Sequence, residues 1–262
     1  MKVLVFGNSN DTDGWVPEGS RRSQDIIRDR LAAEFGEPVE VVAKNTWPNN
    51  RMPSYVAKCI DEAQPDLVFF NVTTYPFAYE SLPLRVRRIF GRFGEPLGDA
   101  GMRLAESKRW SHNAVFRTLR RWGQATIGGD THFTPQEVIE RYAEAIRVAA
   151  RSEGTVVAVK GPFARGKKGT QRERNRQEVR RKPVHMALKQ LCAQLHVHYA
   201  GSDEPYWRLR PTPKGAKAGD GLHSNEKGHA HLAEDHYAVV RDAWAAHIAF
   251  DTTTGQKLPA NV

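Results

Sequence analysis

The sequence predicts an α/β fold, a sandwich of helices around a parallel sheet. Five short apolar runs are bounded by turn residues and have the character of buried parallel strands, and the stretches between them show helical periodicity. A chain of 262 residues, 40% hydrophobic and 26% charged, is long enough for one large core. We therefore expect a single domain over residues 1–262. The predicted strands are residues 3–6, 39–43, 67–72, 155–159 and 196–199.

Helices are predicted between these strands. In residues 20–35 the apolar side chains recur at helical spacing, and Gly36 is a suitable C-cap. A second helix is expected over residues 53–63. The third, over residues 134–150, opens with Thr134-Pro135-Gln136-Glu137, a capping box with proline at the first helical position.

The stretch from residue 76 to 130 is too long for a simple crossover. Residues 84–90 and 110–122 have the pattern of short basic amphipathic helices. We expect a helical insertion here, near the carboxyl edge of the sheet and in the position of a lid.

The formal net charge of +9 comes from two segments. Residues 85–121 hold ten Arg and Lys against three acidic residues, and residues 165–182 hold nine against two. The second segment predicts a basic loop over about 161–182, with the solvated start of a helix from Gln171 onward. Beyond a solvated surface, such segments suit an anionic substrate, an acidic partner or an anionic membrane surface. Nucleic-acid binding is disfavoured because interleaved aromatics and a binding motif are absent from the second segment.

The apolar run at the N-terminus is too short for a signal peptide, and no later run is long enough for a membrane helix, so we expect a cytoplasmic protein without a transmembrane segment. Cys59 and Cys192 lie in helix-like patterns and are expected to be buried and reduced. The histidines lack the spacing of metal ligands, so no metal or cofactor is expected.

Two short stretches carry candidate chemistry. Gly7-Asn8-Ser9-Asn10 follows the first strand, and Asp220-Gly221-Leu222-His223 precedes the last helix. A serine hydroxyl becomes a nucleophile when an imidazole takes its proton, and a carboxylate can hold that imidazole in the required tautomer. Ligands of parallel sheets bind at the carboxyl ends of the strands, where Ser9 is expected. Asp11 and Asp13 compete as the orienting carboxylate, but the spacing of Asp220 to His223 favours Asp220.

These stretches, with the continuation Ser224-Asn225-Glu226-Lys227-Gly228-His229, resemble the first and last sequence blocks of the SGNH, or GDSL, hydrolase family. The resemblance implies a flavodoxin-like three-layer α/β/α fold with five parallel strands, and ester or acyl hydrolysis without metal. It also implies roles for three residues. Ser9 would be the nucleophile, His223 the general base and later acid, and Asp220 the group that orients the imidazole.

The middle blocks of the family match poorly, so the residues that donate hydrogen bonds in the oxyanion hole have alternatives. The second block normally supplies a glycine N–H, and here we expect the backbone N–H of Asn50, with Asn49 as the alternative. The third block normally supplies an asparagine side chain. If the third strand is short, Asn71 fills this role, and if it is longer, Thr73 or Thr74 does. We favour Asn71, with the Ser9 N–H as a donor in either case.

The sequence thus predicts a metal-independent serine hydrolase that cleaves a carboxylic ester through an acyl-enzyme on Ser9, as an esterase, lipase or deacetylase does. The expected substrate is a small acyl ester, and the basic helices favour an anionic or amphiphilic one. Two alternatives stay open: an acyltransferase with the same triad, and a non-catalytic protein of this fold that binds an acidic ligand or partner through its basic surface. The oligomeric state is not predicted.

Overall fold

Five parallel strands form one sheet in the computed structural model, in the order β2-β1-β3-β4-β5. They are β1 (Lys2–Gly7), β2 (Glu40–Asn45), β3 (Leu67–Asn71), β4 (Val156–Lys160) and β5 (His198–Ala200). The structure describes the chain except for residues 12–15, 17–18, 92–95, 97–99, 101–114, 116–117, 119–121, 123–125, 127–128, 164–170, 204–212, 219–222 and 255–262.

All five predicted strands are confirmed, and the differences lie at their ends. β5 begins two residues later than expected because His196 has a φ of 52°, in the left-handed region, and is not extended. β3 ends at Asn71, which agrees with the short-strand alternative for this segment.

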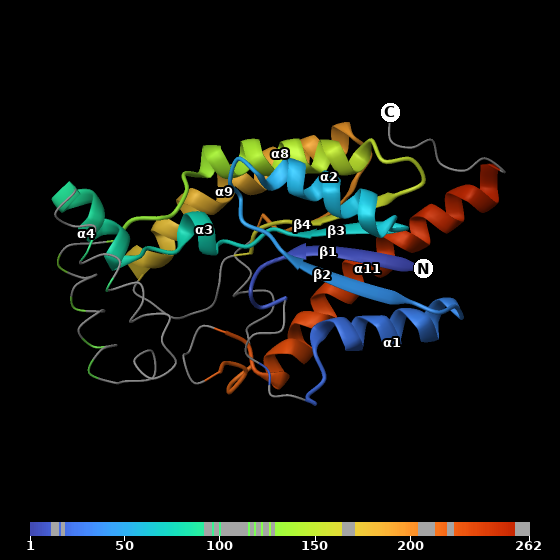
Figure 1. Ribbon diagram of the computed structural model, residues 1–262, viewed down its shortest axis with the longest axis horizontal. Helices are drawn as coiled ribbons and strands as arrows, with labels where there is room; N and C mark the ends of the chain where they lie inside the picture. Colours follow the sequence, from blue (N-terminus) through green and yellow to red (C-terminus); the bar gives the residue numbers. More distant parts are fainter. Residues whose placement is uncertain are drawn as a thin grey trace.

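Helices cover both faces of the sheet and complete a three-layer α/β/α sandwich, as predicted (Figure 1). On one face lie α2 (Met52–Ala63), α8 (Pro135–Ala150) and α9 (Gln171–Gln194). On the other lie α1 (Ser23–Phe35) and α11 (Glu226–Thr254).

The sheet is apolar on both faces because its strands are covered on both sides. Leu4, Phe6 and Phe70 pack in the cluster with α2, α8 and α9, and the alternate residues Val5 and Phe69 pack in the cluster with α1 and α11. This alternation also decides which side chains at the carboxyl edge face α11.

The predicted caps of two helices are present. Gly36 ends α1 with a φ of 68°, and its N–H donates to the Ala32 carbonyl. Thr134 caps α8: its hydroxyl accepts from the Glu137 N–H, and Glu137 accepts from the Thr134 N–H. Their chemistry could be predicted because both caps depend only on neighbours in sequence.

The insertion after β3 begins with α3 (Tyr75–Ala78) and α4 (Leu82–Phe90), and α4 confirms the helix expected over residues 84–90. The beginning and the end of the insertion are joined, since Ser81 and Asp130 exchange backbone hydrogen bonds of 2.8 and 3.1 Å. Most of the helix expected over residues 110–122 lies outside the described residues. Of the basic segment over 161–182, residues from Gln171 onward are the first half of α9, so the loop ends before Gln171.

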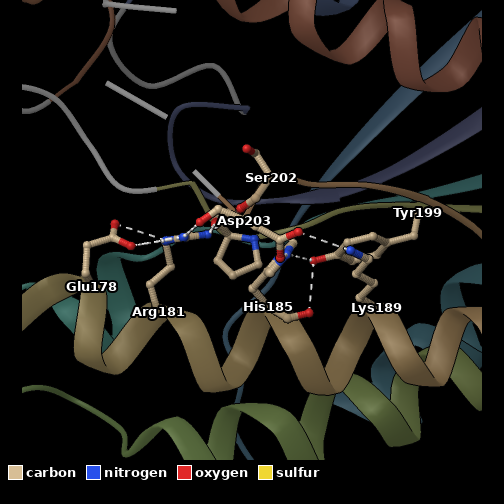
Figure 2. A network of polar contacts seen from close by, with 8 residues as sticks. Glu178, Arg181, His185, Lys189, Tyr199, Ser202 and Asp203 are labelled. Atoms are coloured by element: carbon tan, nitrogen blue, oxygen red, sulfur yellow. Dashed lines mark hydrogen bonds and ion pairs between the residues drawn. The ribbon is translucent and has the colours of Figure 1, made fainter. Parts of the chain in front are cut away.

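A buried polar network fixes the loop after β5 to α9 (Figure 2). The guanidinium of Arg181, whose side chain is 1% exposed, binds Glu178 and donates to the carbonyls of Pro162, Ser202 and Asp203. One turn further along α9, His185 lies 2.8 Å from the Tyr199 hydroxyl and 3.0 Å from the Asp203 carboxylate. This network holds the carboxyl end of β5 in place.

Cys59 and Cys192 are both buried and free, as predicted, and burial raises the pKa of the Cys192 thiol to about 12. Among the helices that the structure describes, none combines the length and the apolar character needed to cross a membrane.

Candidate active site

The residues around Ser9 form a tight turn at the carboxyl end of β1. The Asp11 N–H donates to the Asn8 carbonyl at 2.8 Å, and the Asn8 side chain accepts from the Asn10 N–H at 2.8 Å. A side chain at Gly7 would collide with this turn, because a Cβ there would lie 2.2 Å from Asp11 Oδ2. Local hydrogen bonds of asparagine and aspartate therefore shape the turn that carries Ser9.

His223 is held just before α11 by backbone hydrogen bonds. Its carbonyl accepts from the Ala218 N–H at 2.8 Å, and Lys217 and Ser224 form an antiparallel bridge. Asn225 then caps α11, since its Oδ1 accepts from the Gly228 N–H at 3.1 Å. The polar turn that the sequence places before the last helix thus begins that helix.

The two loops meet although they are 214 residues apart. Ser9 Oγ lies 3.1 Å from His223 Nε2, within reach for proton transfer. When the imidazole proton is on Nδ1, Nε2 accepts a hydrogen bond from the Ser9 hydroxyl. A second link lies beside this pair, because Asn10 Oδ1 accepts from the Ser224 N–H at 2.8 Å.

The expected orienting carboxylate, Asp220, lies outside the described residues, so its role stays a prediction. Of the two competing carboxylates, Asp13 also lies outside the described residues, and Asp11 is 1% exposed with both of its oxygens in contact with the Asn71 amide.

The candidate oxyanion donors lie in three loops. Asn71, at the end of β3, is buried, and its amide nitrogen lies 2.9 and 3.1 Å from the two Asp11 oxygens. An amide nitrogen carries two N–H groups, so Asn71 has to use them for both Asp11 and an oxyanion. Thr74 donates its hydroxyl to the Phe163 carbonyl at 3.2 Å, whereas Thr73 is partly exposed and makes no side-chain hydrogen bond to a described residue.

Asn50, the third predicted donor, is exposed in the turn before α2. In this turn the Asn49 side chain accepts from the Arg51 N–H at 2.9 Å, and the Asn49 carbonyl accepts from the Met52 N–H. The turn lies next to the end of β1, since the Thr46 N–H donates to the Gly7 carbonyl at 2.8 Å. The oxyanion role of Asn50 stays a prediction.

An aromatic cluster at the same edge was not predicted. The Trp47 ring lies 5.1 Å from the His132 ring and 5.7 Å from the Phe133 ring, and Tyr75 stacks on Tyr79 at 5.1 Å. All five side chains are partly exposed, and burial lowers the pKa of His132. The available signal was that Trp47 and Tyr75 follow β2 and β3, the two strands that flank β1.

Comparison with solved structures shows what the chain resembles. TesA matches with a TM-score of 0.52 and 13% identity, over 93% of this chain and 99% of that chain. The psychrotrophic esterase EstA from Pseudoalteromonas sp. matches with a TM-score of 0.51 and 9% identity, over 94% and 98%. A catalytic mutant of Axe2, an acetylxylan esterase from Geobacillus stearothermophilus, matches with 0.52 and 14%, over 91% and 93%.

No protein-family model and no curated protein sequence matches the chain. The three solved structures are all less than 25% identical to the chain, so the match shows the fold alone. They cover 91 to 94% of this chain, so the likeness extends over nearly the whole sequence. The chain has the three-layer α/β/α fold of the SGNH, or GDSL, hydrolases.

Proposed function

We propose that this protein is a metal-independent serine hydrolase that cleaves carboxylic esters through an acyl-enzyme on Ser9. The observation that carries the proposal is the 3.1 Å separation of Ser9 Oγ and His223 Nε2 at the carboxyl edge of the sheet. This contact joins a nucleophile to a base in the fold that also contains the esterases named above.

The steps follow from this pair. Ser9 Oγ attacks the ester carbonyl carbon while His223 Nε2 takes the hydroxyl proton, which gives a tetrahedral intermediate. The intermediate collapses, the alcohol leaves with the proton from His223, and the acyl group stays on Ser9. Water then attacks the acyl carbonyl with His223 as base, and the carboxylic acid and free Ser9 are released.

Other groups have supporting roles in the proposal. The Ser9 and Asn50 N–H groups and the Asn71 amide would stabilise the oxyanion, each such donor contributing about 2.7 to 4 kcal/mol to the transition state. Asp220 would orient the His223 imidazole.

The surroundings of the pair suggest the substrate class. The partly exposed aromatic cluster around Trp47 lies on the loops after β2 and β3 and on the segment before α8, and it would offer an apolar wall for the acyl or alcohol group. Arg85, Arg87 and Arg88 on α4 favour a substrate that is also anionic or amphiphilic. We therefore propose a small acyl ester.

The test is covalent labelling with a fluorophosphonate, together with turnover of short p-nitrophenyl esters. The wild type is expected to label and turn over, whereas S9A should do neither and H223N should lose at least about 10³-fold in kcat. S54A is the matched control, because Ser54 is an exposed serine on α2 whose hydroxyl donates to the Arg51 carbonyl. Labelling that persists in S9A, or no labelling and no turnover in the wild type, would refute the hydrolase.

One observation favours a second candidate, a binding protein that keeps the fold without efficient catalysis. The Asn71 amide, the favoured side-chain donor of the oxyanion hole, donates to Asp11. If this contact leaves the hole one donor short, the transition state loses much of its stabilisation. A folded wild type that neither labels nor turns over esters, but binds an acidic ligand, would select this candidate.

A further inference from the structure

A buried carboxylate lies directly beneath the turn that carries Ser9. Asp11 is 1% exposed, and its Oδ2 accepts from the Asn8 N–H at 2.8 Å and from the Asn71 amide at 2.9 Å. Its Oδ1 lies 3.1 Å from the same amide and 3.6 Å from His236 Nδ1. Asp11 thus touches β1's turn, the end of β3 and α11 with one side chain.

The surroundings of Asp11 leave it little freedom to move. Gly7 packs against its carboxylate so closely that a Cβ would lie 2.2 Å from Oδ2. His236 is also 1% exposed and packs on the Phe69 ring at 5.1 Å. Burial, with the charge of Lys160, holds the pKa of His236 well below its usual range.

The contacts of Asp11 and Asn10 tie the Ser9 turn to the element that begins beside His223. Asn10 accepts from the N–H of Ser224, the residue after His223, and Asp11 faces His236 about three turns into α11. Ser9 lies between Asn8, which Asp11 binds, and Asn10, which Ser224 binds. A shift of Asp11 would therefore move Ser9 relative to His223.

We propose that Asp11 is a positioning residue of this site: its carboxylate sets the place of Ser9 against His223 and the orientation of the Asn71 amide. This inference rests on the proposed hydrolase function. Asp11 acts through these residues and does not itself touch substrate. A misplacement of about 1 Å in an active site can cost about 10²-fold in rate. A displacement of Asp11 is therefore expected to lower kcat.

The variant D11N tests the proposal with the smallest change of shape. It replaces one acceptor oxygen with an NH₂ group, which must face the N–H of Asn8, the amide of Asn71 or Nδ1 of His236. We expect kcat and the rate of fluorophosphonate labelling to fall at least about tenfold, with KM within about twofold of the wild type. A purely structural role would lower thermal stability and leave these rates of the folded protein unchanged.

D66N is the matched control. Asp66 also accepts a backbone N–H of β1, from Lys2 at 2.6 Å, but at the opposite edge of the sheet. The same Asp-to-Asn change there should leave kcat, KM and the labelling rate at wild-type values.

A second variant, G7A, displaces the Asp11 side chain without removing its charge, and it should also lower kcat with KM retained. A folded D11N or G7A with wild-type kcat and labelling rate would overturn the positioning role. Failure of the proposed function is a separate result, because it appears as a wild type that is not labelled at Ser9.

Discussion

At the scale of single residues, Ser9 and His223 depend on their sequence neighbours for their geometry. Asn8, Asn10 and Asp11 close the turn around Ser9, while Asn225 begins the helix after His223. These neighbours have short polar side chains, which compete well for nearby backbone groups. The blocks that resemble the SGNH family are therefore also the blocks that build the two loops.

The oxyanion donor after β3 can be identified by comparing N71A with T73V. Because β3 ends at Asn71, we expect N71A to lower kcat by about 10² to 10³-fold, the usual effect of losing one donor. T73V, which removes a hydroxyl that is partly exposed, should change kcat less than threefold. Steady-state kinetics with a p-nitrophenyl ester measures both, and the reverse order of effects would place the donor at Thr73.

At the residue level, predictions could be made where the signal is local, and the role of Asp220 stays a prediction because this residue lies outside the described part of the chain. The Asp220 to His223 spacing and the turn around Ser9 could be read from consecutive residues. The contacts of Asp11 could not be read in this way, since its partners Asn71 and His236 lie 60 and 225 residues away and meet it only in the folded protein. From the sequence alone, a carboxylate two residues after Ser9 is therefore only a competitor of Asp220.

At the scale of elements, the start of α11 decides where His223 lies. Gly228 is in the first turn of this helix, and a Cβ there would lie 2.2 Å from the Ala216 carbonyl oxygen and 2.7 Å from Ser224 Cβ. The loop that holds His223 therefore packs against the helix at a distance that only glycine permits.

We predict that G228A lowers both stability and kcat, although alanine is the better helix former by about 1 kcal/mol. The added methyl group should push Ala216 and Ser224 away from the helix, and His223 would move with Ser224 relative to Ser9. Thermal unfolding and ester kinetics are the measurements, and K227A, at the exposed neighbouring position, is the control. A more stable G228A with wild-type kcat would contradict this explanation.

The elements themselves were predictable because buried parallel strands give continuous apolar runs, and the helices between them have one apolar face. The residues at which the strands begin and end were harder to predict. Residues 196 and 197 continue an apolar strand pattern, but the left-handed turn at His196 delays β5 to His198. Such a turn follows from how α9 ends, and α9 in turn depends on its packing against α8.

At the scale of the whole molecule, burial opposes the protonation of several histidines. Burial lowers the pKa of His132, His185 and His198, and it lowers that of His236 most strongly. In each case the unfolded chain, with a histidine pKa near 6.5, takes up a proton more readily than the folded chain does. The free energy of unfolding should therefore decrease as the pH falls through about 6.5.

We predict that the free energy of unfolding decreases from pH 7.5 to pH 5.5, with a slope of at most about 1.4 kcal/mol per pH unit for each histidine whose pKa folding lowers. The carboxyl groups with lowered pKa, Glu137 and Asp203, lose their contribution only below about pH 4.5, so they do not act in this window. Urea unfolding at several pH values measures the slope. H236N should lower this slope by up to about 1.4 kcal/mol per pH unit, the effect of one proton. H196N, at an exposed position, should leave the slope unchanged. A stability that is constant from pH 7.5 to 5.5 would show that these histidines do not stay neutral in the folded chain.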